Sequence, residues 1–180
     1  MIICAGNNET FNFAQPMGVG LIQTAMNLTR LCLFDKPEFL LFVGSAGSYG
    51  DLDIFEIVES KTASNIELAF LSNDAYTPLD NVVTTNTTNK KDIVINSSNY
   101  ISTNATLTKN FLKFGVGAEN MEFFAVLQIA KEFNIPAGGV FCITNYTNEN
   151  AHEDFLKNHE KAKELLSEHV KKRIEELTKK

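Results

Sequence analysis

Hydrophobic residues in this chain fall into short continuous runs that alternate with longer stretches of helical spacing. A short apolar run closed by Gly, Asn, Asp or Pro is typical of a buried strand. Such runs predict strands at residues 2–5, 39–43, 54–58, 92–95 and 139–143. Residues 62–70 alternate only weakly between polar and apolar side chains, and they are a candidate for one more strand.

Apolar residues spaced three or four apart predict helices at residues 21–33, 107–114 and 121–133, and from residue 152 to the end of the sequence. The first of these follows Gly18-Val-Gly20 and is broken at Pro37. The last carries Glu and Lys around a regular apolar stripe, which predicts a long amphipathic helix.

Alternation of strands and helices predicts an α/β protein with a mixed, mostly parallel sheet. The 180 residues fit a single domain with a sizeable core. Residues 72–91 are rich in Asn and Thr, and we expect them to form a surface excursion from that domain.

The formal net charge of −6 argues against nucleic acid or an anionic membrane as a partner, because both require clustered cations. No apolar run reaches membrane-spanning length, and the first residues lack a basic segment typical of a signal peptide. Cys4, Cys32 and Cys142 each lie in an apolar run, which favours buried free thiols in a reducing compartment. We therefore expect a cytoplasmic protein.

The most informative polar residues are Glu122, at the start of a predicted helix, and Asn145, just beyond a predicted strand. In an α/β protein both positions lie on the rim of the sheet where ligands bind. A carboxylate and an amide on that rim suit a neutral, hydroxyl-rich ligand such as a nucleoside. Considered alone, Glu122 would be better explained as complementing the dipole of its helix.

Two glycine-containing segments are further candidates. Gly44-Ser45-Ala46-Gly47 follows a strongly apolar strand, and its small residues would let the backbone and the Ser45 hydroxyl approach a ligand. A nucleophilic serine would require Gly-x-Ser-x-Gly with a histidine in reach, so a binding loop is favoured. Gly18-Val-Gly20 could cradle a phosphate or allow close packing of helix on strand, and both interpretations remain open. The three histidines, His152, His159 and His169, are predicted to lie on a solvated helix face without a metal.

Together these segments resemble the nucleoside phosphorylase superfamily, which includes purine nucleoside phosphorylases, uridine phosphorylases and methylthioadenosine/adenosylhomocysteine nucleosidases. The resemblance is carried by residues 2–9, Gly18-Val-Gly20, Val43-Gly-Ser-Ala-Gly47, Asn96-Ser-Ser-Asn-Tyr-Ile101, Met121-Glu122 and Ile143-Thr-Asn145. It implies a three-layer αβα fold and a homo-oligomer, dimeric or larger. The sheet should be reduced, because few residues separate Glu9 from Gly18.

The resemblance also implies a role for each matching residue. Glu122 would hold the ribose hydroxyls, Met121 would pack against the ribose, and Tyr100 would stack on a purine base. Asn145 would bind purine N7, Glu9 would activate water, and Ser45 would bind near the nucleophile. The implied catalytic residues are thus Asn145 and Glu9, and the implied substrate-binding residues are Glu122, Met121, Tyr100, Ser45, Gly44 and Thr144.

Two departures from the family pattern bear on the reaction. Asn145 stands where an acidic proton donor is usual, although the phosphorylases that prefer 6-oxopurines also have Asn there. Arg30 and Arg173 are the only arginines, and Phe42 occupies the place of a phosphate-binding arginine. Cleavage of purine nucleosides by water is therefore favoured over cleavage by phosphate, which would be the co-substrate of a phosphorylase; no other cofactor is expected. The alternatives are a purine- or nucleoside-binding relative with weakened catalysis and a purely structural protein.

Overall fold

The computed structural model describes residues 1–85 and 92–178, and within them nine strands form one mixed sheet. The strands are β1 (Ile2–Cys4), β2 (Gln15–Pro16), β3 (Leu40–Ser48), β4 (Ile57–Ser60), β5 (Thr62–Ser64), β6 (Val82–Thr84), β7 (Val94–Ser97), β8 (Val116–Asn120) and β9 (Ala137–Tyr146). The helices are α1 (Leu21–Asp35), α2 (Leu68–Leu71), α3 (Ala105–Thr108), which continues into a 3-10 helix (Lys109–Phe114), α4 (Phe123–Glu132) and α5 (Ala151–Thr178).

The sheet has the order β2-β1-β3-β8-β7-β5-β6, and β9 pairs with both β3 and β4. Five pairings are parallel, namely β1–β2, β1–β3, β3–β9, β5–β7 and β7–β8. The pairings β3–β8, β4–β9 and β5–β6 are antiparallel. The predicted mixed, mostly parallel sheet is therefore confirmed.

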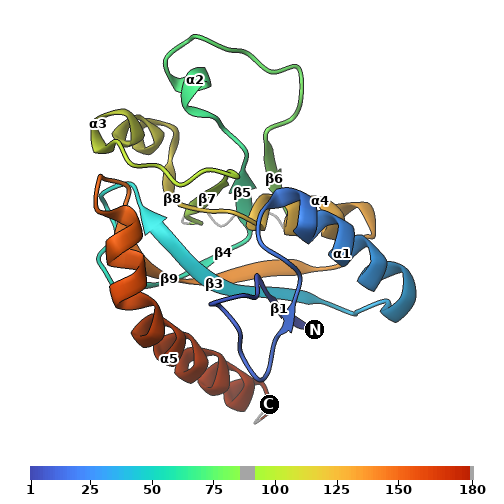
Figure 1. Ribbon diagram of the computed structural model, residues 1–180. Coiled ribbons are helices and arrows are strands. Elements are labelled where there is room, and N and C mark those ends of the chain that lie inside the picture. The colour runs from blue at the N-terminus through green and yellow to red at the C-terminus, as the bar shows by residue number, and fades with distance from the viewer. Residues whose placement is uncertain (86–91, 179–180) are drawn as a thin grey trace.

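Helices cover both faces of the sheet, with α1 and α4 on one side and α5 on the other (Figure 1). The larger core lies under α1 and α4, where the rings of Phe42, Phe123 and Phe141 pack with centroids 5.0 to 6.2 Å apart. On the opposite face, α5 packs its apolar stripe on β1, β3 and β9. The three-layer arrangement thus follows from one helix stripe buried on each face.

Several element predictions are wrong in detail. Strand β3 continues through Gly44–Gly47, where a loop was expected, because β9 pairs with it along its whole length and the small residues fit between neighbouring strands. Strand β8 was not predicted, since its sequence Val-Gly-Ala-Glu-Asn has few apolar residues. The candidate strand at 62–70 divides into β5 and the short helix α2, and the helix at 107–114 is mostly a 3-10 helix.

The segment predicted as a surface excursion begins as expected, with residues 72–80 exposed. Val82–Thr84 then form β6, an edge strand antiparallel to β5. The end of the predicted excursion, residues 86–91, lies outside the described residues. Between Glu9 and Gly18 the structure contains only the two-residue strand β2, so this part of the sheet is short.

Two adjacent glycines in β9 provide a test of how tightly the phenylalanine core is packed. A Cβ atom on Gly139 would lie 2.5 Å from Cε2 of Phe141 and 2.7 Å from Cε2 of Phe123, whereas the nearest atom to one on Gly138 is Ser60 O at 3.4 Å. We expect Gly139→Ala to lower the free energy of unfolding by about 1–3 kcal/mol through overpacking. Gly138→Ala, the matched control, should stay within about 0.5 kcal/mol of wild type. Equal urea midpoints for the two variants would contradict this account.

Candidate active site

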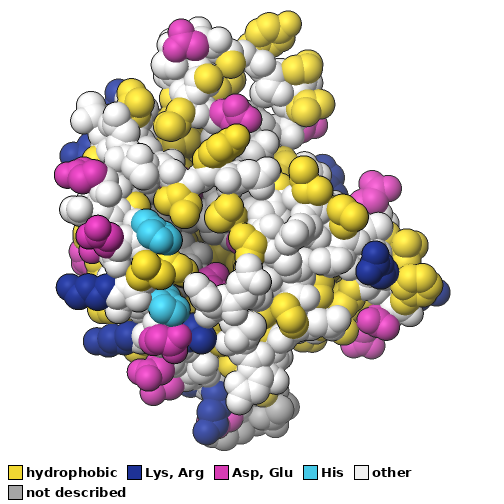
Figure 2. Space-filling model, in the orientation of Figure 1, with side chains coloured by type: hydrophobic (Ala, Val, Ile, Leu, Met, Phe, Trp, Pro, Cys, Tyr) yellow, Lys and Arg dark blue, Asp and Glu magenta, His cyan; other side chains and the backbone are white. Residues whose placement is uncertain are grey.

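A cavity of about 270 Å³ opens on the rim formed by the ends of β1, β3, β8 and β9. The first turn of α5 and the loop after β7 complete its walls. Figure 2 views this hollowed face, with histidine side chains on the side formed by α5. Lying where strand ends meet helix starts, the cavity has the usual position of a ligand site in an α/β fold.

Six of the eight predicted site residues line this one cavity. They are Glu9, Ser45, Tyr100, Met121, Glu122 and Asn145. The other two predicted residues, Gly44 and Thr144, are not among the residues that line the cavity. Gly44 lies within β3, where a Cβ atom would come 2.9 Å from the Phe42 ring, and the fully buried Thr144 contacts Asn145.

Glu9 follows β1 in a tight turn, closed by a bridge between Gly6 and Glu9. Its Oε1 accepts a hydrogen bond from Ser45 N at 2.9 Å. Burial raises the pKa of the Glu9 carboxyl, and this outweighs the opposing effects of the hydrogen bonds from Ser45 and of His159 and Lys163 on α5. A carboxylate with a raised pKa is a better proton acceptor near neutral pH.

Glu122 stands at the N-terminus of α4, yet its side chain does not cap that helix. Its Oε1 accepts from Gly20 N at 2.8 Å, and its Oε2 accepts from Asn120 Nδ2 and Met121 N, both at 3.2 Å. Burial raises the pKa of Glu122 to about 7; the hydrogen bond from Gly20 opposes this shift and the charge of Glu9 adds to it.

The contact with Glu122 also decides between the two interpretations of Gly18-Val-Gly20. Gly20 N is bonded to Glu122, and Leu21 N is bonded to Asn99 Oδ1 at 2.9 Å. The start of α1 thus donates to acceptors of the protein itself, which does not support a phosphate cradle. Gly20 has a φ of +85°, a conformation that favours glycine, and a Cβ there would lie 2.9 Å from the Asn99 amide oxygen.

A β-bulge positions Asn145. Ala46 pairs with Ile143 and Gly47 pairs with Asn145, so Thr144 is an extra residue in β9. Bulges of this kind redirect the side chains beside them. Thr144 Oγ1 donates to Asn145 Oδ1 at 2.9 Å, and Asn145 Nδ2 donates to Tyr146 O at 3.2 Å. The bond to Tyr146 O uses one of the two hydrogens on the amide nitrogen, so the second is left to donate.

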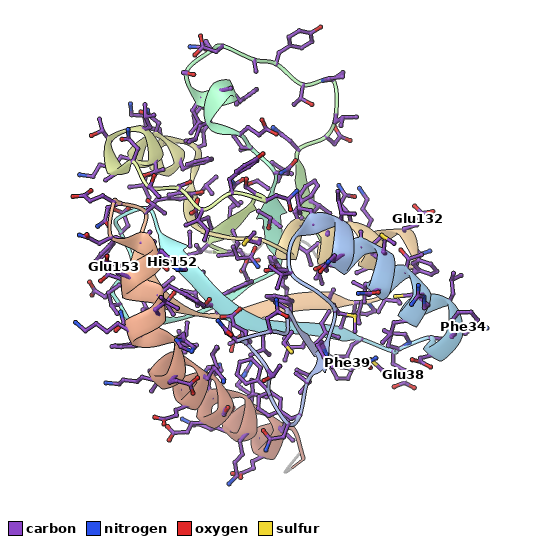
Figure 3. All side chains as sticks on the ribbon, in the orientation of Figure 1. Phe34, Glu38, Phe39, Glu132, His152 and Glu153 are labelled. Carbon is purple, nitrogen blue, oxygen red and sulfur yellow. The ribbon has the colours of Figure 1, made fainter. Side chains whose placement is uncertain are left out.

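The cavity residues that were not predicted as site residues include Glu119, Asn120, His152 and Phe155. His152 was expected on a solvated helix face; it is exposed, but it belongs to the first turn of α5 at the cavity wall (Figure 3). The short connection between β9 and α5 was an available signal, because a helix that starts five residues after a strand must begin near the same rim.

The cavity is acidic. Of the described residues, those that line it include three glutamates and no lysine or arginine. Arg30 is exposed on α1, and Arg173 pairs with Glu59 and Glu176 on the surface of the α5 side. In the described part of the chain no cluster of three His, Cys, Asp or Glu side chains could hold a metal ion. Such a cavity suits a neutral or cationic ligand better than a dianion.

Comparison with known proteins agrees with the architecture. The family model described as "Phosphorylase superfamily" matches residues 2–175. A futalosine hydrolase mutant from Helicobacter pylori superposes with a TM-score of 0.79 at 16% identity, covering 97% of each chain. A methylthioadenosine/S-adenosylhomocysteine nucleosidase from Streptococcus pneumoniae gives 0.73 at 14%, covering 94% of this chain and 95% of its own.

A mutant of the corresponding nucleosidase from Helicobacter pylori, with 5′-methylthioadenosine in its active site, gives a TM-score of 0.77 at 19% identity. The match covers 91% of this chain and 79% of the nucleosidase. Among curated proteins, none matches this sequence. At these identities the solved structures establish the fold of the chain.

The raised pKa of Glu122 has a consequence for stability. Because the folded pKa of about 7 exceeds the ordinary 4.5, the folded state binds this proton more tightly. The resulting stability is fully present below pH 4.5 and is lost as the pH rises through 7. In the wild-type protein, this group should lower the unfolding free energy by roughly 3 kcal/mol between pH 4.5 and 8. Glu122→Gln has no carboxyl group to titrate, so it should lack this part of the fall. Glu132→Gln, on the exposed side of the same helix, should leave the fall unchanged. Parallel pH profiles for Glu122→Gln and wild type would rule this out.

Proposed function

Because the chain belongs to the phosphorylase superfamily, we propose that it cleaves the N-glycosidic bond of purine nucleosides, with water as the attacking group. The observation that carries this proposal is the convergence of Glu9, Ser45, Glu122 and Asn145 on one cavity. The reaction requires a group that activates the nucleophile, a group that stabilises positive charge on the ribose, and a group that receives the leaving base.

Glu122 suits the ribose. Its carboxylate is fixed by donors from α1 and from the end of β8, and it retains lone pairs that can accept from the 2′- and 3′-hydroxyls. When ionised, it also stabilises the positive charge that develops on the sugar as the bond to the base breaks. Met121, which lines the cavity beside it, supplies an apolar contact for the ribose.

Asn145 and Tyr100 suit the base. Tyr100 lies at the cavity mouth with 83% of its surface exposed, which leaves its ring free to stack on a purine. The Asn145 amide nitrogen would donate to N7, where negative charge accumulates as the base departs. An amide stabilises that charge without delivering a proton, so the proton would come from water.

Water is favoured over phosphate by the charges around the cavity. Phosphate is held in proteins by cations or by many donors, and the lining residues described here contribute three glutamates instead. Glu9 is positioned by Ser45 N, and its raised pKa suits the removal of a proton from water. The names of the neighbours, futalosine hydrolase and nucleosidases, also support hydrolysis.

A second candidate is a nucleoside-binding relative with weakened catalysis. Asn145 favours this alternative, because an amide cannot act as a general acid. The Helicobacter pylori nucleosidase neighbour is an aspartate-to-asparagine mutant with 5′-methylthioadenosine in its active site. A relative with an asparagine in place of an aspartate can therefore hold a nucleoside.

We also propose that copies of the chain associate. Five large apolar residues on and just after α1 are between 50% and 79% exposed, namely Ile22, Met26, Leu33, Phe34 and Phe39. Phe34 and Phe39 lie on this outer part of the molecule (Figure 3).

Within the described residues, no helix has the length and apolar composition needed to cross a membrane. The three buried free cysteines support a reducing compartment, as in the cytoplasm.

Hydrolysis can be tested by incubating the protein with inosine, guanosine and methylthioadenosine, with and without phosphate. We expect free base to appear without phosphate, and added phosphate should not accelerate its release. Glu9→Gln should lower kcat by about 10²–10⁴-fold, because a general base contributes that much. Glu56→Gln, which lies away from the cavity, is the matched control.

Release of base only in the presence of phosphate would reverse the choice of nucleophile. Tight binding of purine nucleosides by calorimetry, without release of base and without an effect of Glu9→Gln, would favour the binding relative. The absence of both binding and turnover would exclude the two candidates together.

A further inference from the structure

One carboxyl group in the cavity wall has no part in the proposed reaction. Glu119 lies in β8, paired with Gly47 of β3 on one side and with Asn96 of β7 on the other. It is only 6% exposed, and burial raises the pKa of its carboxyl. A buried carboxylate is costly unless it is fully hydrogen-bonded, so its partners indicate why it is there.

Those partners lie mainly in one residue of the loop between β7 and α3. Ser102 N donates to Glu119 Oε1 at 2.8 Å, and Ser102 Oγ donates to Glu119 Oε2 at 2.6 Å. The third donor is the hydroxyl of Tyr49, at 2.9 Å from Oε2. Tyr49 is itself buried and stacks on Phe111 with centroids 4.3 Å apart, so the carboxylate is held by a rigid neighbour.

The start of the same loop is also held by hydrogen bonds. Ser98 N donates to Asn120 O at 3.2 Å, and Asn99 Oδ1 accepts from Leu21 N at 2.9 Å. Tyr100 and Ile101 lie between these contacts and Ser102. They line the cavity mouth while remaining 83% and 50% exposed. The course of this two-residue wall is therefore set by its two attachments.

We propose that Glu119 is a positioning residue, which holds Ser102 and thereby sets where Tyr100 and Ile101 wall the base side of the cavity. A carboxyl group is suited to this task because its two oxygens accept separately, one from the backbone amide and one from the hydroxyl of Ser102. The consequence for nucleoside cleavage rests on the proposed function, whereas the anchoring of the loop does not.

Hydrogen–deuterium exchange of the protein without ligand tests the anchoring. Glu119→Ala and Ser102→Ala should each speed exchange of the amides in residues 98–104, by about tenfold in Glu119→Ala, because buried hydrogen bonds are lost. Exchange in α4 should not change. Glu56→Ala is the matched control, since Glu56 also accepts from a backbone amide, that of Asp53, but on the surface. Ser102→Ala removes only one hydroxyl from a partly buried loop, so it keeps the test valid if Glu119→Ala folds poorly.

Steady-state kinetics tests the consequence. Glu119→Ala should raise KM by about tenfold and leave kcat within about twofold, equally for 6-amino- and 6-oxopurine nucleosides. Glu119→Gln, which retains an acceptor for Ser102 N, should restore both KM and slow exchange. Unchanged exchange in both Glu119→Ala and Ser102→Ala would overturn the inference. A changed preference between the two purine classes in Glu119→Gln, with exchange unchanged, would also overturn it, by indicating direct contact with the base. If no nucleoside is cleaved, the exchange experiment still decides the anchoring.

Discussion

The hydrogen bond from Gly20 N to the Glu122 carboxylate is the contact on which the arrangement of the site depends. It joins the start of α1 to the start of α4, two segments more than one hundred residues apart in sequence. The positive end of the α1 dipole thereby offsets part of the effect of burial, which still raises the pKa of Glu122 to about 7. The remaining bonds, from Asn120 and Met121, fix the same carboxylate to the end of β8. One buried acid thus connects helix, sheet and cavity.

The other acidic residues of the cavity follow the same principle. Each carboxyl group accepts hydrogen bonds from other groups of the protein. The donors are Ser45 for Glu9, Ser102 and Tyr49 for Glu119, and the start of α1 for Glu122. Burial raises the pKa of each of the three carboxyl groups, and the charge of Glu9 adds to the shift at Glu122. The cavity consequently combines proton acceptors with a negative field, which suits a reaction that develops positive charge on its substrate.

Much of this site could be predicted from the sequence. Glu122 and Asn145 could be placed on a common rim because each lies beside a clearly predicted element, and the rim is a general property of α/β sheets. The family resemblance then supplied Glu9, Ser45, Met121 and Tyr100, all of which line the cavity.

The remaining features depend on contacts that are distant in sequence or on irregular backbone. Strand β8 carries Gly117, Glu119 and Asn120, so no hydrophobic run marks it. The bulge at Thr144 is visible only in the register between β3 and β9, and it separates Thr144, which supports the wall, from Asn145, which faces the cavity. Glu119 accepts a hydrogen bond from Tyr49, which is 70 residues away in the sequence, and no local sequence pattern indicates this contact.

The most direct test of the account is a crystal structure of Glu9→Gln, in which turnover should be blocked, with a purine nucleoside bound. The account predicts ribose hydroxyls on Glu122, purine N7 beside the Asn145 amide nitrogen, the base against Tyr100, and a water molecule between residue 9 and the anomeric carbon. A nucleoside bound away from this cavity, or a phosphate ion beneath the ribose in place of that water, would contradict it.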